Sequence, residues 1–144
     1  MRQHLFVAGF MLTLTVPALA QQAASAPELA GVASAREGVK AERLAFEYFK
    51  AAPDSLISVA RITVAPGQFI PMHTHSGPEF QYVISGELEE TAGDEPMRTL
   101  KAGEGQFAAG NVPHGLKNTG KEPATFIAFI TGTKGERLTW PFKK

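Results

Sequence analysis

Two histidines and a glutamate lie close together in GQFIPMHTHSGPEFQYVISG, residues 67–86, a stretch that otherwise has the composition of β-strands. His73 and His75 are separated by one residue. In a strand, side chains at that spacing project from the same face, roughly 6–7 Å apart, so both imidazoles can reach one point between them. The turn-forming residues 76–78 follow and can bring the Glu79 carboxylate back to the same point. This pattern predicts a site for a metal cation with nitrogen and oxygen ligands.

A fourth ligand has to come from another part of the chain, and His114 in NVPHGLKN is the candidate. The chain has four histidines, and the remaining one, His4, lies in a segment that we expect to be removed. A single histidine is more often a hydrogen-bonded or surface residue than a ligand, and a polar loop is often only solvated surface. The clustering of His73, His75 and Glu79 favours the metal site over that alternative.

The first twenty residues, MRQHLFVAGFMLTLTVPALA, predict a secretory signal peptide over residues 1–20. Arg2 gives a positive start, the apolar run is too short to span a bilayer, and the segment ends in a small-residue cleavage site. A buried N-terminal helix is the alternative. The chain contains no cysteine, so neither disulfides nor thiolate metal ligands are available. Export into a bacterial periplasm fits these features best.

Composition limits the class of protein and its partners. A chain of 144 residues with 44% hydrophobic and 19% charged residues has room for one ordinary globular core. The formal net charge is zero and no basic cluster stands out, which argues against nucleic acid as a partner. The lack of a polybasic patch also argues against a membrane partner once the signal is cleaved. We therefore expect a small-molecule ligand or substrate.

The order of patterns along the chain predicts an all-β fold. Residues 21–37 are rich in Ala, Ser and Gly and predict a flexible lead-in, which leaves 38–144 as a single domain. Residues 41–50 alternate apolar and polar positions and predict an edge strand, with a short helix as the alternative. Beyond Leu56, short apolar strands are broken by Gly and Pro turns, as in a β-sandwich or small barrel. We expect strands within residues 56–64, 79–85, 87–93, 97–103, 105–111, 112–118 and 124–132.

The spacing of the glycines, histidines and glutamate resembles the first conserved motif of the cupin superfamily. That motif is matched by Gly67, His73, His75, Glu79 and Gly86. The second cupin motif is matched at Gly103, His114 and Asn118, whereas Ala109 and Asn111 stand where Pro and Gly are usual. The resemblance covers residues 56–131. It implies a double-stranded β-helix (jelly-roll) barrel, with His73, His75, Glu79 and His114 pointing into the interior as metal ligands.

The expected ligand set indicates the kind of cofactor and chemistry. Three imidazoles and one carboxylate suit one divalent transition metal, namely Fe, Mn, Ni, Co, Cu or Zn, and the sequence does not distinguish among these. Such a set leaves two positions of a six-coordinate ion open. The chain is similar to the quercetin-dioxygenase-like group, which implies a dioxygenase acting on a small substrate that chelates the metal through oxygen. Glu79 would then double as a catalytic proton acceptor. A binding module without turnover and a metal-dependent isomerase are the alternatives.

Two further predictions concern the pocket and the assembly. Phe69 and Gln81 share strand parity with the ligands and are expected to line the substrate pocket, with plain barrel core as the alternative for Phe69. Trp140, near the C-terminus, is expected to pack against the barrel or a second subunit. We expect a homodimer.

Overall fold

The computed structural model describes residues 37–143. The predicted signal peptide, and all of the predicted lead-in except Glu37, therefore lie outside the described residues. The described part contains no helix, and so none that is long and apolar enough to cross a membrane. Ten strands account for its regular structure: β1 (Val39–Phe49), β2 (Ala52–Val64), β3 (Phe69–Thr74), β4 (Glu79–Ser85), β5 (Glu87–Ala92), β6 (Arg98–Lys101), β7 (Gly105–Ala108), β8 (His114–Lys117), β9 (Ala124–Thr133) and β10 (Trp140–Pro141).

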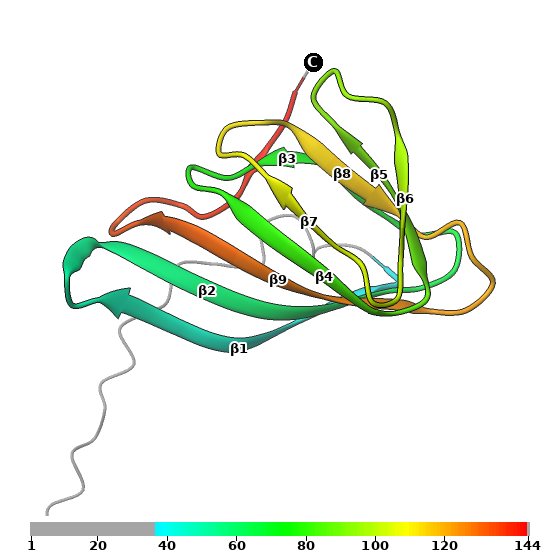
Figure 1. The fold of residues 1–144 in the computed structure, drawn as a ribbon, viewed down its shortest axis with the longest axis horizontal. Helices are drawn as coiled ribbons and strands as arrows, with labels where there is room; N and C mark the ends of the chain where they lie inside the picture. Colours follow the sequence, from blue (N-terminus) through cyan, green and yellow to red (C-terminus); the bar gives the residue numbers. More distant parts are fainter. Residues whose placement is uncertain (1–36, 144) are drawn as a thin grey trace, which may run out of the picture.

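The strands form two antiparallel five-stranded sheets that face each other. One sheet has the order β1-β2-β9-β4-β7 and the other the order β10-β3-β8-β5-β6. In Figure 1 the first sheet is the lower layer, and β3, β8, β5 and β6 lie above it. Strands distant in sequence are neighbours in both sheets, as β2 with β9 and β3 with β8. This is the all-β, double-stranded β-helix arrangement that the resemblance implied.

Alternation of buried and exposed residues explains how the two sheets build a core. In β2, every second residue from Leu56 to Val64 is buried, and β9 shows the same period of two from Ala124 to Ile130. Side chains of a strand point alternately to its two faces, so one face of each strand is buried between the sheets. Fifteen buried apolar residues, among them Leu56, Phe126 and Leu138, form one core cluster between the sheets.

The N-terminal segment of the domain is a strand and not a helix. Residues Val39–Phe49 form β1, which pairs with β2 along nearly its whole length and is an edge of the first sheet. The prediction of an edge strand over residues 41–50 is confirmed. Trp140 begins β10 and pairs with Thr74 of β3, so the C-terminal segment packs against the barrel of its own chain.

Candidate metal centre

The four predicted ligands meet where three strands begin or end. His73 is in β3, and His114, the first residue of β8, is its direct partner across the ladder. His75 follows the end of β3, and a turn leads from it to Glu79, the first residue of β4. Strand β4 belongs to the other sheet. The cluster therefore bridges the two sheets, and it exists only when β3, β8 and β4 are all in register.

The geometry of the cluster fits a single metal ion. One ligand atom from each of His73, His75, Glu79 and His114 can be chosen so that all four lie within 4.8 Å of one another. All four residues are buried, with exposed fractions between 1% and 6%. An ion bonded to nitrogen or oxygen at about 2.0–2.2 Å keeps its ligands within about 4.4 Å of one another. Closure around an ion therefore needs movements of only about a few tenths of an ångström.

Backbone carbonyls hold each imidazole in one orientation. His73 Nδ1 lies 2.8 Å from the Pro71 carbonyl oxygen, and His75 Nδ1 lies 2.7 Å from that of Leu138. His114 Nδ1 lies 3.0 Å from the Val112 carbonyl oxygen. A carbonyl can only accept, so each Nδ1 carries the hydrogen and donates it. Each Nε2 is left with its lone pair, as is usual for histidines that bind a metal.

Nε2 of His114 and Nε2 of His75 both indicate that a cation belongs beside the Glu79 carboxylate. Nε2 of His114 lies 2.8 Å from Oε2 of Glu79, although the Nδ1 hydrogen of His114 is already donated to Val112. A neutral imidazole would bring a lone pair against a carboxylate there, so the contact needs either a proton or a metal ion. Nε2 of His75 is buried without a hydrogen-bond partner and lies 3.4 Å from the same oxygen. Both features fit a bound metal ion.

The electrostatics of the pocket follow from burial and from the carboxylate. Burial, with the nearby His114 and His75, lowers the pKa of His73 from 6.5 to about 4, so this imidazole is neutral at neutral pH. Burial would also lower the pKa of His114, but its contact with Glu79 outweighs burial and raises it. Burial would raise the pKa of Glu79, yet the hydrogen bond from His114 and the nearby His75 imidazole bring it well below its usual range. The cluster thus offers an ionised carboxylate and a neutral His73 imidazole, and His114 becomes a ligand once a metal ion replaces the proton at its contact with Glu79.

A chain of amide groups holds the Glu79 carboxylate from behind. Gln81 Nε2 donates to Glu79 Oε2 at 3.0 Å, and Gln106 Nε2 donates to Gln81 Oε1 at 3.2 Å. Both glutamines are buried. Such outer partners orient a metal-binding carboxylate. Gln81 also lines the cavity beside the cluster, where the sequence placed it, and it therefore has two roles there.

A small apolar cavity adjoins the ligands inside the barrel. Besides three of the ligands, two polar residues line it, Gln81 and Thr139. The other lining residues are apolar: Ala41, Ile62, Ile70, Leu116, Phe126 and Ile130. About 20 Å³ of it is open to the centre of a water-sized sphere. A single water needs about 10–15 Å³ by that measure, so the space beside the cluster holds one or two water-sized molecules.

The prediction that Phe69 lines this pocket is wrong, as is the alternative of plain barrel core. Its side chain is 39% exposed and borders a different, outer groove with Met97. The cause is a bulge in β3, because three steps from Ile70 to His73 pair with two steps on β8. Pro71 lies in that interval and has no N–H for the ladder. The extra residue reverses the alternation of inward and outward side chains before Pro71 relative to the histidines after it. Ile70 therefore lines the cavity, and Phe69 points outward.

The second motif keeps its turn although its usual residues are replaced. Asn111 has φ 62° and is the only described residue other than glycine with positive φ. Asparagine tolerates this left-handed conformation better than most residues, so it can replace the usual glycine. Its N–H donates to the His75 carbonyl oxygen at 2.7 Å. The turn before His114 is thereby tied to the turn that follows His75.

One buried carboxylate near the site was missed in the sequence. Glu90 in β5 is 1% exposed; its Oε2 accepts from Arg98 Nε at 2.8 Å, while its Oε1 has no partner. Burial raises the pKa of Glu90, and the contact with Arg98 offsets only part of that effect. With Gln106 it lines an open cavity of about 970 Å³ between the β5–β6 hairpin and the β7–β8 loop. The sequence signal that could have indicated its burial is strand parity, since Glu90 lies on the same face of β5 as the buried Leu88.

Comparison with known proteins agrees with this architecture. Residues 60–130 match the family described as Cupin domain. A germin-like protein of Arabidopsis thaliana (subfamily 2 member 2) is 40% identical over 77 residues, which are 50% of this chain and 35% of that protein. The rhicadhesin receptor of Pisum sativum is 38% identical over 77 residues, 50% of this chain and 36% of the receptor. The chain thus spans only about a third of the length of these curated relatives.

Solved structures show the same fold over more of the chain. A conserved Klebsiella pneumoniae protein with a double-stranded β-helix domain has a TM-score of 0.58 and 27% identity, covering 78% of this chain and 91% of that one. Bacillus subtilis oxalate decarboxylase has a TM-score of 0.57 and 27% identity, covering 74% of this chain and 29% of the decarboxylase. The matched family, the shared fold and the buried His73, His75, Glu79 and His114 cluster place this chain in the cupin superfamily.

Proposed function

We propose that this protein is an exported, single-metal cupin that oxidises a small organic substrate coordinating the ion through oxygen. His73, His75, Glu79 and His114 hold the ion. A divalent transition metal held by these residues would supply Lewis acidity and O₂ chemistry to a small substrate that binds through oxygen. The observation that supports this function best is the buried cluster, whose three imidazoles are held by backbone carbonyls. Nε2 of His114 and Nε2 of His75 lie 2.8 and 3.4 Å from the same carboxylate oxygen of Glu79.

The size and lining of the cavity favour a small substrate. With about 20 Å³ open beside the ligands, a flavonol-sized molecule does not fit without displacing barrel residues such as Ile70 or Leu116. The apolar walls exclude bulk water, which strengthens electrostatic interactions inside the site. Gln81 and Thr139 are the lining groups, apart from the ligands, that can hydrogen-bond a substrate. A compact molecule with oxygen atoms on two adjacent carbons fits these limits.

Glu79 is the proposed proton acceptor. The lining residues that titrate are His73, His75 and Glu79, all of which are ligands. An isomerase would need a second acid–base group in the same cavity, and among the described lining residues none is present. The isomerase alternative therefore has less support than oxidation. A binding module without turnover needs no such group, so it remains the second candidate.

The relatives support a metal function of this kind. The Bacillus subtilis oxalate decarboxylase structure is described by its Mn(II) centres, and oxalate is a small molecule with oxygen atoms on two adjacent carbons. The match covers only 29% of that decarboxylase, so we do not propose oxalate as the substrate of this chain. Manganese is accordingly one of the ions to test first, together with iron.

The experiment has a metal arm and a turnover arm. Elemental analysis of protein purified from its native compartment identifies the ion, with His75→Ala as the control that should lose it. O₂ consumption is then measured with each metal form, using a small enediol, a catechol and a flavonol. Consumption with the small substrates and not with the flavonol is expected. Substrate-dependent spectral change without O₂ consumption would favour the binding module, and protein without stoichiometric metal would overturn both.

Export rests on residues 1–20 and has its own test. N-terminal sequencing of the protein from a periplasmic fraction should begin at Gln21, directly after the Ala-Leu-Ala segment. A cytoplasmic protein that retains Met1 would contradict export and leave the metal site unaffected.

A further inference from the structure

The open cavity beside Glu90 is lined by two residues that each carry a buried oxygen atom without a hydrogen-bond partner. This cavity, of about 970 Å³, lies between the β5–β6 hairpin and the β7–β8 loop, and none of the four metal ligands is among the described residues that line it. Glu90 contributes to it from β5 and Gln106 from β7. Oε1 of Glu90 and Oε1 of Gln106 are both buried and have no partner among residues 37–143. Two acceptors at this cavity therefore lack a donor.

The other polar atom of each of these side chains is already engaged. Glu90 Oε2 accepts from Arg98 Nε at 2.8 Å, and Gln106 Nε2 donates to Gln81 Oε1 at 3.2 Å. Glu90 is only 1% exposed and Gln106 only 5%, so bulk water does not solvate either side chain. A buried acceptor without a donor is unfavourable, and native proteins contain few such atoms. The pair therefore indicates a bound group that donates hydrogen bonds.

We propose that this cavity binds a small organic cation, namely a primary ammonium group on a short apolar body. The ammonium donates one hydrogen bond to Glu90 Oε1 and a second to Gln106 Oε1. Glu90 belongs to the second sheet and Gln106 to the first, so the ligand bridges the two sheets. The proposal is independent of the proposed oxidation, since it depends neither on the metal ion nor on turnover.

The two acceptors favour an ammonium group over other classes of ligand. A guanidinium binds a carboxylate best through both oxygens, and Arg98 already occupies Oε2 of Glu90. An ammonium is compact, carries three donors and needs only one carboxylate oxygen. A quaternary ammonium has the charge but no N–H, so it would leave both oxygens without a donor. A metal ion is not expected, because among the described residues the side chains grouped closely enough to hold one are those of the His73 cluster.

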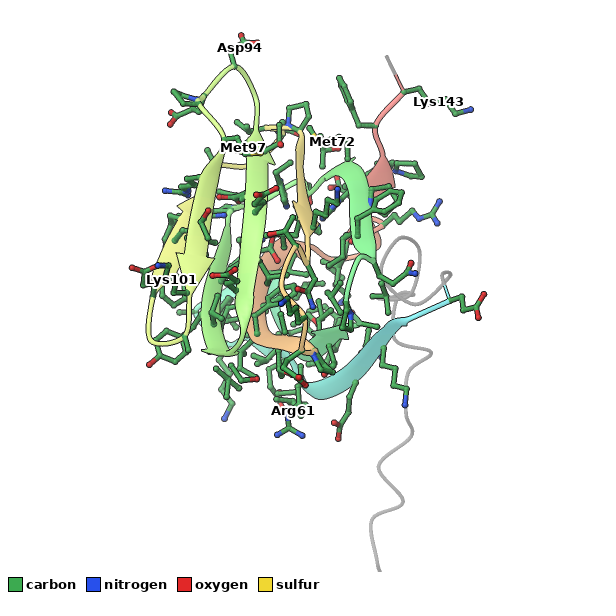
Figure 2. The ribbon with its side chains drawn as sticks, turned by 90° about the vertical axis from the view of Figure 1, so that its right-hand side faces the viewer. Arg61, Met72, Asp94, Met97, Lys101 and Lys143 are labelled. Atoms are coloured by element: carbon green, nitrogen blue, oxygen red, sulfur yellow. The ribbon has the colours of Figure 1, made fainter. Side chains whose placement is uncertain are left out.

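The rest of the lining suits both the charge and the body of such a ligand. Asp94 and Glu95 in the turn of the hairpin add to Glu90, so acidic side chains outnumber the one basic side chain, Arg98. Figure 2 shows Asp94 at the tip of the hairpin, at the top of the view. Phe107, which is 68% exposed, and the alanine, valine and proline residues of the lining offer apolar surface to the body of the ligand. A cation near the Phe107 ring gains a further favourable contact.

Access to the two buried oxygens requires movement of a side chain in the cavity wall. Arg98 is the candidate, because it lines the cavity, its side chain is 50% exposed and it contacts Glu90 through Nε. Exposed side chains change rotamer within about nanoseconds, so this movement is not a barrier to binding. The strands and their hydrogen bonds stay in place.

The first experiment titrates n-butylammonium chloride into isotope-labelled full chain loaded with zinc, and follows the backbone amides by NMR. Zinc is used because its filled d shell does not broaden the signals. We expect saturable shifts at residues 90–98 and 106–113, with a dissociation constant of about 1 mM for so small a ligand. Tetramethylammonium, a cation without N–H, should bind at least about tenfold more weakly. Equal affinity for both cations, shifts confined to residues 73–79, or no saturable shift would overturn the proposal.

The second experiment repeats the butylammonium titration with variants of the two acceptors. Glu90→Gln keeps the size of the side chain but removes its charge, and should weaken binding by about tenfold or more. Gln106→Leu removes the second acceptor and should also weaken it. Glu89→Gln is the matched control, because Glu89 is the preceding residue of β5 and borders the outer groove with Phe69 instead of this cavity. Circular dichroism checks that each variant is folded. Unchanged affinity in both acceptor variants, or an equal loss in Glu89→Gln, would overturn the site.

Discussion

His114 Nε2 lies 2.8 Å from Glu79 Oε2 while His114 Nδ1 is committed to the Val112 carbonyl. The metal-free protein must therefore hold a proton between the imidazole and the carboxylate. His114 belongs to β8 of one sheet and Glu79 to β4 of the other. The shared proton thus joins the first residue of β8 to the first residue of β4, across the two sheets. A metal ion that replaces the proton would join the same two strands.

Metal binding should release about one proton, because the ion displaces the proton of the His114–Glu79 pair. The raised pKa of His114 keeps this proton bound into the neutral range. Lowering the pH therefore weakens metal binding, by up to about tenfold per pH unit for one displaced proton. His73, with a pKa of about 4, competes with the metal only near that lower pH. Calorimetry in two buffers of different ionisation enthalpy measures the proton count, and a pH-independent affinity between about pH 5 and pH 7 would contradict the shared proton.

Replacing His75 with alanine should remove most of the bound metal and leave the barrel folded. His75 Nε2 has no hydrogen-bond partner in the metal-free protein, so the cost to folding comes mainly from the lost Nδ1 hydrogen bond to the Leu138 carbonyl, about 1–3 kcal/mol. The affinity should fall by more than the roughly 10–100-fold that loss of an outer partner costs. Elemental analysis and circular dichroism measure the two effects. Arg61→Ala, at an exposed position, is the control, and an unchanged metal content in His75→Ala would refute the ligand assignment.

Gln81→Leu should weaken metal binding by about 10–100-fold without removing any ligand. The substitution deletes the amide that donates to Glu79 Oε2 at 3.0 Å, so the carboxylate loses one of the contacts that orient it. Gln106→Leu is the matched variant, since Gln106 reaches Glu79 only through Gln81 and its loss should have a smaller effect. Competition with a chelator measures both affinities. Equal effects of the two substitutions would mean that general destabilisation, and not positioning of Glu79, is responsible.

Gly86→Ala should destabilise the fold more than Gly67→Ala. Both glycines have positive φ, 76° and 73°, so each alanine incurs roughly 1 kcal/mol of backbone strain. A Cβ at Gly86 would also lie 2.8 Å from Ala124 Cα, whereas one at Gly67 would meet nothing within 4 Å. Urea unfolding of the metal-free variants measures the difference. A larger loss for Gly67→Ala would contradict the crowding at Gly86.

Much of the fold and of the metal site could be predicted from local patterns. Alternation along β2 and β9 predicted buried strands, because the face of a strand depends only on its own period of two. The His-x-His spacing and the turn before Glu79 predicted three neighbouring ligands for the same local reason. His114 followed only by elimination, as the remaining histidine outside the predicted signal peptide, and the family resemblance agreed with that choice. Nothing near His114 in the sequence indicates that it pairs with His73.

Other features depended on contacts between distant segments. The bulge before His73 placed Ile70 in the cavity and turned Phe69 outward, and a bulge is defined only by the partner strand β8. Strand parity puts Glu90 on the same face as Leu88, but a carboxylate is ordinarily exposed, and its burial appears only once β5 lies between β6 and β8. The sequence alone determined which residues could bind a metal and which segments are strands, because both depend on neighbours in the chain. Only the tertiary structure decided which carbonyl holds the His75 imidazole and how large the cavity beside the ligands is, because these arise where remote segments meet.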